Sequence, residues 1–142
     1  MWERTRCSCR TELVWDGERR ATGLTPEGAA AVVGPAESWR PEQLLAMAVD
    51  AATMMEFLAL ADAERLEVLG YVSSARVTPG RRADDGALIV LAPCIVVAGA
   101  DGVETAMRLL ERALASSLVG RSLRVLPGLE PEIVAAPLAA TV

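Results

Sequence analysis

The stretch RPEQLLAMAVDAATMMEFLALA, residues 40–61, decides the fold of this chain. Pro41 stands where the first residue of a helix is favoured, and Glu42 places an acidic side chain in the first turn. The pattern predicts one long helix over residues 41–65, which Gly70 separates from the next element. Projected around a helix axis, the polar side chains fill somewhat under half of the circumference. These polar residues are Glu42, Gln43, Asp50, Thr53 and Glu56.

The apolar side of this helix is broader than contact with one sheet requires. The pattern by itself favours an amphipathic core helix whose polar stripe faces solvent. However, small residues allow another helix to approach closely, and the rest of the chain is too short to cover a second side. We therefore predict that a second copy of the chain covers the helix. Its methionines are typical core filler, although methionine-rich walls also suit adaptable apolar pockets. The small residues are Ala46, Ala48, Ala51 and Ala52, and the methionines are Met47, Met54 and Met55.

The residues before the helix predict a small antiparallel sheet. Loosely alternating segments are separated by turn-forming residues, as in a hairpin followed by a third short strand and a loop. These N-terminal strands occupy residues 1–39, with segments at 5–15, 19–25 and 26–38 and a hairpin turn at Asp16-Gly17.

The residues after the helix predict further strands and a second helix. Residues 70–100 form strands, and within them 87–100 is either a strand pair or one long strand bent at Pro93. Residues 101–119 carry apolar side chains at helical spacing. A last strand and a tail follow in residues 121–142. Strands, helix, strands, helix and strand in this order define an α+β fold rather than a doubly wound sheet.

The composition fits one globular domain over residues 1–142. Hydrophobic residues make up 52% of the chain, which is enough for a sizeable core. The net charge is −5, and the basic residues gather only in pairs such as Arg19-Arg20 and Arg81-Arg82, which argues against a nucleic-acid partner. The charged start MWERTRCSCR argues against a secretory signal, and the uncharged run at 86–100 is too short to span a bilayer. We therefore expect a cytoplasmic protein without a membrane partner.

Residue types that support redox or metal chemistry are scarce. The chain has no histidine, which removes the usual general base and the commonest metal ligand. Three cysteines are too few for an ordinary structural zinc site, so we expect neither a metal nor a cofactor. Cys7 and Cys9 lie two residues apart on a predicted strand and point to one face. Cys94 lies in an apolar run, where a thiol packs as a small buried hydrophobe.

The segment PEQLLAMAVDAATMM resembles the central helix of the OsmC/Ohr family, the osmotically inducible and organic hydroperoxide resistance proteins. In that family Pro-Glu-(Glu/Gln)-Leu-Leu leads through small and apolar residues to a cysteine. ERALASSLVGRSL, residues 111–123, is similar to the second helix of the family and the Cys-Pro that follows it. The resemblance covers essentially the whole chain in order and spacing. It implies an OsmC-like α+β fold, with antiparallel sheets packed around two central helices in an intertwined homodimer.

The resemblance also implies a thiol peroxidase mechanism. A peroxidatic cysteine on the first helix attacks the peroxide, an arginine and a glutamate hold it as thiolate, and a resolving cysteine closes a disulfide. In this sequence the peroxidatic position is Ala52 and the resolving position is Ser117, with Leu118 in place of the following proline. Alanine has no nucleophile, and no histidine is present to activate the serine. We therefore expect the peroxidase chemistry to be absent.

The other residues of the family's site are only partly retained. Its glutamate falls on Glu42, which lies about 15 Å along the helix from Ala52, so a site that combines the two needs Glu42 from a second chain. Arg19 or Arg20 is a candidate for the supporting arginine, and Arg40 is another.

Two polar residues lie beside the vacated cysteine position. Asp50 and Thr53 are either a solvated pair or part of an interchain ion pair, in which an arginine of the second chain is the expected partner of the aspartate. Alternatively, together with Glu42 they form an altered site for another ligand.

Three hypotheses follow for the function. In the first, the chain is an OsmC-like homodimer without the catalytic cysteines, which binds a small apolar ligand at the dimer interface or keeps the cleft as a remnant. In the second, it is a working thiol-dependent hydroperoxide reductase that uses Cys7 and Cys9, or Cys94. In the third, it is a non-catalytic partner subunit of a cysteine-bearing paralogue.

Overall fold

The computed structural model describes residues 9–82 and 84–137. Its contacts divide the chain into two compact units, of which the first ends at Leu45 and the second begins at Ala46. The boundary falls within the long helix α1, Pro41–Ala63, so the first turn of this helix belongs to the first unit. The two units are described separately below, and the single-domain organisation expected from the composition stays a prediction.

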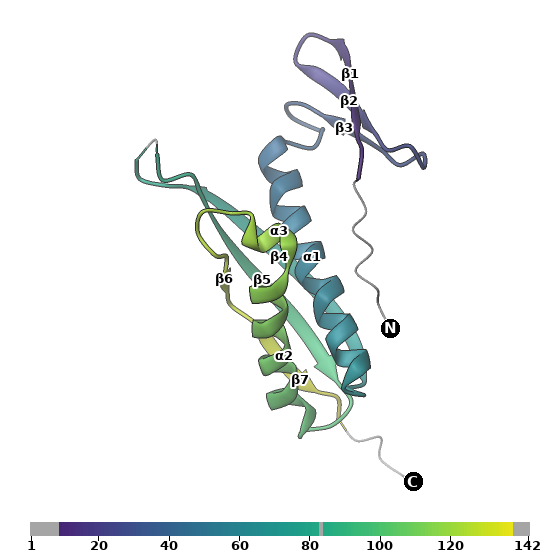
Figure 1. The fold of residues 1–142 in the computed structure, drawn as a ribbon, viewed down its shortest axis with the longest axis vertical. Coiled ribbons are helices and arrows are strands. Elements are labelled where there is room, and N and C mark those ends of the chain that lie inside the picture. The colour runs from purple at the N-terminus through teal and green to yellow at the C-terminus, as the bar shows by residue number, and fades with distance from the viewer. Residues whose placement is uncertain (1–8, 83, 138–142) are drawn as a thin grey trace. The chain divides into compact units, whose positions relative to one another are not determined.

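The first unit is built on a three-stranded antiparallel sheet in the order β1-β2-β3 (Figure 1). The predicted hairpin and third strand are confirmed. The hairpin turn lies at Gly17 and Glu18, both with positive φ, where a glycine is the least strained residue. Thr22 donates a hydrogen bond of 2.6 Å to Asp16 across the hairpin. The strand bounds are β1, Glu12–Gly17; β2, Arg20–Leu24; and β3, Ala30–Val33.

The first unit has no hydrophobic core of its own among its described residues. No side chain between residues 9 and 45 is fully buried. Leu13 is 72% exposed and Trp15 is 74% exposed, although both lie on β1. A sheet of three strands gains little stability unless one face is covered. The apolar side chains of this sheet therefore require cover from outside the unit.

The second unit contains a mixed sheet with helices on one face. β4 and β5 pair antiparallel over most of their length, whereas β6 and β7 run parallel to β5 and pair with it one after the other. Of the alternatives for residues 87–100, the structure has one continuous strand, in which Pro93 lies opposite Ser73. The bounds are β4, Val68–Pro79; β5, Ala87–Val97; α2, Gly102–Ser116; α3, Leu118–Arg121; β6, Gly128–Leu129; and β7, Glu132–Ala135.

The core of the second unit lies between this sheet and the two long helices, which cover the same sheet face (Figure 1). Alternate side chains of β5 point into the core, as the twofold period of a strand requires. Phe57 and Ala61 of α1 meet Ile95 of β5 in the larger cluster, and Val49 meets Leu91 in the smaller one. The predicted α+β architecture is confirmed, with antiparallel pairing in the first sheet and between β4 and β5.

The two faces of α1 differ from the expected pattern. The buried residues recur every three or four positions, as expected for one helix face, but they include two polar ones. Asp50 is 9% exposed and Thr53 is fully buried, so the prediction that they lie on a solvated polar arc is wrong. Conversely, several large apolar side chains of α1 are exposed within this chain. They are Leu45, Met47, Met55 and Leu58.

Both helices end close to the predicted positions for identifiable reasons. α1 stops at Ala63 because Arg65 adopts a positive φ of 56°. The Leu66 N–H then bonds to the Ala61 carbonyl at 2.8 Å, which is the pattern of a left-handed helix cap. The second helix, predicted over 101–119, is interrupted at Ser117, whose backbone is extended, and continues as the short α3.

α1 is also long and apolar enough to cross a membrane, judged by length and composition only. The same properties are typical of the core helix of a soluble protein, and 28% of its most apolar window is buried within this chain. This helix is a second long apolar segment beside the run at 86–100, on which the expectation of no membrane partner was based. The absence of a membrane partner therefore stays a prediction.

The cysteines occupy different surroundings from those expected. Cys94 is exposed because it points to the sheet face opposite the core, between the buried neighbours Pro93 and Ile95, so the prediction of a buried thiol is wrong. Cys9 is exposed and precedes β1, which begins at Glu12, so it is not on the predicted strand. Cys7 lies outside the described residues.

Candidate functional site

Ala52 and Ser117, the positions where the resemblance to the OsmC/Ohr family predicts cysteines, lie in the second unit. Ala52 is half-buried on α1, on the side that also carries the exposed Met55. Ser117 is only 4% exposed and is the N-cap of α3. Its hydroxyl accepts a hydrogen bond of 3.3 Å from the Gly120 N–H, and Leu118 is the first helical residue. Proline is favoured at a first helical position, so the Cys-Pro of the family pattern fits this cap geometry.

A side-chain contact joins the neighbourhoods of these two positions. Ser116 donates a hydrogen bond of 3.3 Å to the carboxylate of Glu56. Glu56 lies one helical turn after Ala52, and Ser116 directly precedes Ser117. The end of α2 therefore approaches α1 close to the vacated positions. This contact was not predicted, because sequence spacing does not reveal which turns of two helices meet.

Asp50 and Thr53 are satisfied within their own chain. The Ser73 hydroxyl of β4 donates to Asp50 Oδ1 at 2.7 Å. The Thr53 hydroxyl donates to the Val49 carbonyl at 2.9 Å, one turn back on the same helix. The expected arginine of a second chain is therefore not required to explain the burial of Asp50, although a carboxylate can accept more than one hydrogen bond.

A buried tyrosine hydroxyl lies near this aspartate. Tyr71 belongs to the same face of β4 as Ser73, and its ring packs against Phe57 with centroids 5.8 Å apart. Among the described residues its hydroxyl is buried without a hydrogen-bond partner. Burial raises the pKa of Tyr71 to about 12, and the negative charge of Asp50 contributes to the shift. Tyr71 and Ser73 were not predicted as site residues, although their alternation on β4 places both toward the helices.

The charged candidates gather in a groove of the first unit. The groove has a volume of about 650 Å³ and is lined by Arg19, Arg20, Arg40 and Glu42 together with apolar side chains. The three candidate arginines and the family's glutamate therefore share one surface. Gly34 in its wall is required by close packing, because a Cβ there would lie 2.9 Å from the Arg19 carbonyl oxygen. We call this surface the arginine groove.

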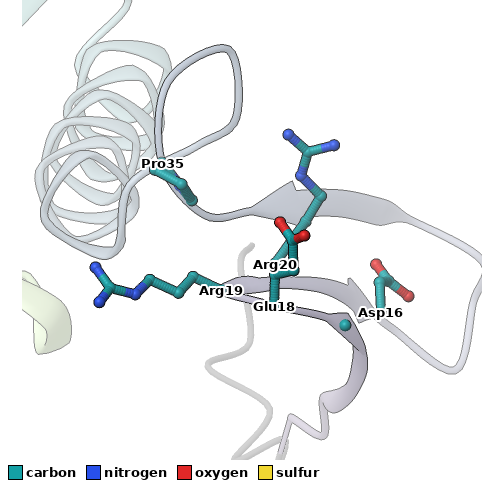
Figure 2. A pocket seen from close by; sticks show the side chains of 6 residues that line it. Asp16, Glu18, Arg19, Arg20 and Pro35 are labelled. Carbon is teal, nitrogen blue, oxygen red and sulfur yellow. The ribbon is translucent and has the colours of Figure 1, made fainter.

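A neighbouring depression shows how the two adjacent arginines diverge. It is lined by Asp16, Glu18, Arg19, Arg20 and Pro35 (Figure 2). The Arg19 side chain extends to the Pro35 side, away from both carboxylates, whereas Arg20 and Glu18 extend in the same general direction. Arg19 lies in the turn before β2 and Arg20 is the first residue of that strand.

The predicted site residues thus fall into two groups. Arg19, Arg20, Arg40 and Glu42 lie together in the first unit, while Ala52, Asp50, Thr53 and Ser117 lie in the second. Within the described ranges, no three histidine, cysteine or acidic side chains gather as metal ligands would. The first group can bind an anion, and the second offers hydrogen-bonding groups but no activated nucleophile.

The sequence matches no protein-family model and no curated protein. Several solved structures nevertheless have the same fold. An OsmC-like protein of unknown function from Vibrio cholerae has a TM-score of 0.73 at 16% identity, covering 92% of this chain and 98% of that one. An OsmC-like protein from Mycoplasma pneumoniae has a TM-score of 0.72 at 13% identity, covering 92% and 96%. The organic hydroperoxide resistance protein OhrB of Bacillus subtilis has a TM-score of 0.65 at 15% identity, covering 91% and 99%.

These similarities establish that the chain has the OsmC-like α+β fold, shared by OsmC-like and organic hydroperoxide resistance proteins. The structural alignment extends over nearly the full length of both chains, as the order and spacing of the sequence elements predicted. At identities of 13–16% it establishes the fold and leaves the chemistry to the residues of this chain.

Proposed function

We propose that the chain forms a cytoplasmic OsmC-like homodimer of the peroxide-stress class that has lost thiol peroxidase activity and binds a small apolar ligand between its two chains. The observation that carries this proposal is the combination of an OsmC-like fold with Ala52 and Ser117 at the two cysteine positions. The fold is retained where the reacting atoms are not.

The uncovered apolar surface supports the homodimer. The sheet of the first unit has no buried side chain among residues 9–45, and α1 exposes Met47 and Met55 at 50% and 53%. Exposed apolar clusters of this kind mark interaction surfaces. A second copy of the chain supplies a helix and a sheet of the same kind, each lacking cover. When the two copies associate, each covers the exposed apolar surface of the other.

The local chemistry supports the loss of peroxidase activity. A peroxidatic cysteine attacks the O–O bond, releases an alcohol and becomes a sulfenic acid, which a second thiol converts to a disulfide with loss of water. Ala52 cannot take the first step. Ser117 cannot take the second, because a hydroxyl forms no stable bond to sulfur, and it already accepts the Gly120 N–H as a helix cap.

The exposed thiol of Cys94 is the observation that favours the alternative of a working peroxidase. Its exposure gives peroxides access, which a buried thiol would not. However, its Sγ lies 3.8 Å from a carboxylate oxygen of Glu132. Cys94 also lies on the sheet face opposite the core, so peroxidase chemistry there would need a site other than the helix position of the family pattern.

A hydroperoxide assay tests the proposal. With cumene hydroperoxide and dithiothreitol, we expect the wild-type protein to consume no more peroxide than dithiothreitol alone. The double variant Ala52→Cys with Ser117→Cys is expected to gain dithiol-dependent turnover, because it restores both thiols. Wild-type turnover that disappears in Cys94→Ser would contradict the proposal and establish the alternative. Co-purification with a cysteine-bearing paralogue in a mixed oligomer would instead identify the chain as a partner subunit.

A further inference from the structure

The arginine groove combines a positive end with apolar walls. Leu13 and Trp15 of β1 line it together with Arg19, Arg20, Arg40 and Glu42. The Trp15 indole N–H donates to the Glu18 carbonyl at 2.9 Å, so its polar edge is satisfied and the ring remains an apolar wall. A ligand that fills such a groove needs an apolar body and a polar end.

The charge of the groove is opposite to that of the whole chain. Three guanidinium groups and one carboxylate line it, a net charge of +2, whereas the chain carries −5. Guanidinium groups bind carboxylates through paired, charge-assisted hydrogen bonds, which are stronger than neutral ones. A local positive surface on an acidic protein therefore selects an anionic end group over a neutral one.

The arginines are not equivalent as anion anchors. Arg20 extends in the same general direction as Glu18, whereas Arg19 extends away from both Asp16 and Glu18 (Figure 2). Arg40 lines the arginine groove but not the neighbouring depression that contains Asp16 and Glu18. Arg19 and Arg40 are thus the guanidinium groups best placed to meet a ligand.

We propose that the arginine groove binds an amphiphilic carboxylate, with its head group at Arg19 and Arg40 and its apolar chain along Leu13 and Trp15. This inference goes beyond the proposed function, because the groove is formed by residues of one chain and its binding does not require the dimer. It also gives the ligand a charged head group, whereas the proposed function requires only an apolar body. The positive groove also lies entirely within the first unit, so its residues can be varied without altering the core of the second.

Binding of decanoate, decanol and decylamine to the full-length protein, measured by calorimetry and by tryptophan fluorescence, tests the inference. We expect decanoate to bind at least about tenfold more tightly than decanol at low salt, because only the carboxylate makes charge-assisted hydrogen bonds. The difference in affinity between decanoate and decanol should become smaller in about 0.5 M NaCl, where exposed charges are screened. Decylamine should bind more weakly than decanol, because its charge is repelled.

Variants locate the head group. Arg19→Gln is expected to weaken decanoate binding about five- to tenfold while leaving decanol binding unchanged, and Arg19→Lys should retain part of the affinity because the charge remains. Arg40→Gln should act in the same direction, and Arg20→Gln should have a smaller effect. Arg81→Gln is the matched control, since Arg81 is exposed in the loop between β4 and β5, outside the groove.

Two results would overturn the inference. One is equal affinities for decanoate and decanol, and the other is a loss of decanoate affinity in Arg81→Gln as large as that in Arg19→Gln. The inference and the proposed function fail separately. Arginine-dependent decanoate binding by a protein that is monomeric in light scattering supports the groove and contradicts the dimer. A dimer that binds decanol and decanoate with equal affinity supports the proposed function and contradicts the proposed carboxylate head group.

Discussion

Ser117 has a structural role at the junction of two helices. Its hydroxyl caps α3, and its extended backbone separates α3 from α2. Serine is among the best N-cap residues, because a short side-chain oxygen reaches the unpaired N–H groups of the first turn. Serine is therefore well suited to the local backbone at this position, where we propose that it takes no part in a peroxidase cycle.

Removal of the Ser117 cap should lower the stability of the protein. We expect Ser117→Ala to lower the free energy of unfolding by about 1 kcal/mol, because the Gly120 N–H loses its acceptor in a buried place. Urea denaturation followed by circular dichroism measures the change. Ser122→Ala is the control, since Ser122 is the exposed C-cap residue of α3 and its hydroxyl donates to the Leu118 carbonyl. Equal stability of Ser117→Ala and wild type would show that the cap is not used.

Tyr71 should make the protein sensitive to alkaline pH. Its folded-state pKa is raised from 10.0 to about 12, so the folded state holds the phenol proton more tightly than the unfolded state. The resulting stabilisation is complete below pH 10 and is lost as the pH rises toward about 12. In Tyr71→Phe this part of the alkaline decline should disappear.

The same variant tests the buried hydroxyl at neutral pH. Because the Tyr71 hydroxyl has no partner among the described residues, Tyr71→Phe should be as stable as wild type or more stable. Urea titrations of both proteins across the alkaline range measure the difference, and the comparison cancels the titration of the cysteines. Absorbance of the single tyrosine reports its ionisation directly. An ionisation midpoint close to 10 would contradict the burial of the hydroxyl.

At the level of elements, α1 decides the fold and also carries the largest difference from expectation. Its boundaries were predictable because Pro41 begins it and the local pattern holds to its end. Its orientation was not, since Asp50 and Thr53 face the sheet while Met47 and Met55 do not. A polar residue on a helix faces solvent unless a buried hydrogen-bond partner is present. For Asp50 this partner is Ser73, which belongs to a strand later in the sequence.

In the other elements, too, local pattern was predictable and long-range contacts were not. Strand alternation and the turn residues between segments predicted β1, β2, β3 and β4. In contrast, the parallel pairing of β6 and β7 with β5 depends on long-range contacts that alternation does not encode. For the site, the gathering of Arg19, Arg20 and Glu42 in one groove was not deducible from spacing. Residue types indicated the chemistry, whereas tertiary packing decided which residues meet.

The exposed side of α1 should form the interface between two copies. We expect Met55→Glu to shift the protein from dimer to monomer, because it places a charge where an apolar side chain 53% exposed within one chain would be buried by the second. Met55→Leu is the matched control, since it keeps an apolar residue of similar volume. Gel filtration at several concentrations measures the shift. A Met55→Glu protein that elutes as wild type would place the interface elsewhere.

At the scale of the whole molecule, the chain presents a cored unit and a unit without a core. The second unit buries two hydrophobic clusters between its sheet and helices. The first unit buries none among its described residues, and its sheet gains stability only through contacts that it does not itself contain. We propose that a second copy of the chain supplies those contacts, as the resemblance of the sequence to the OsmC/Ohr family implies.

Light scattering coupled to gel filtration tests this central claim most directly. For the full chain at micromolar concentration we predict one species with twice the chain mass of 15.0 kDa. The species should persist on dilution, because it buries the apolar surfaces of both copies. A single species of 15.0 kDa would contradict the account, since no second copy would then cover the first unit.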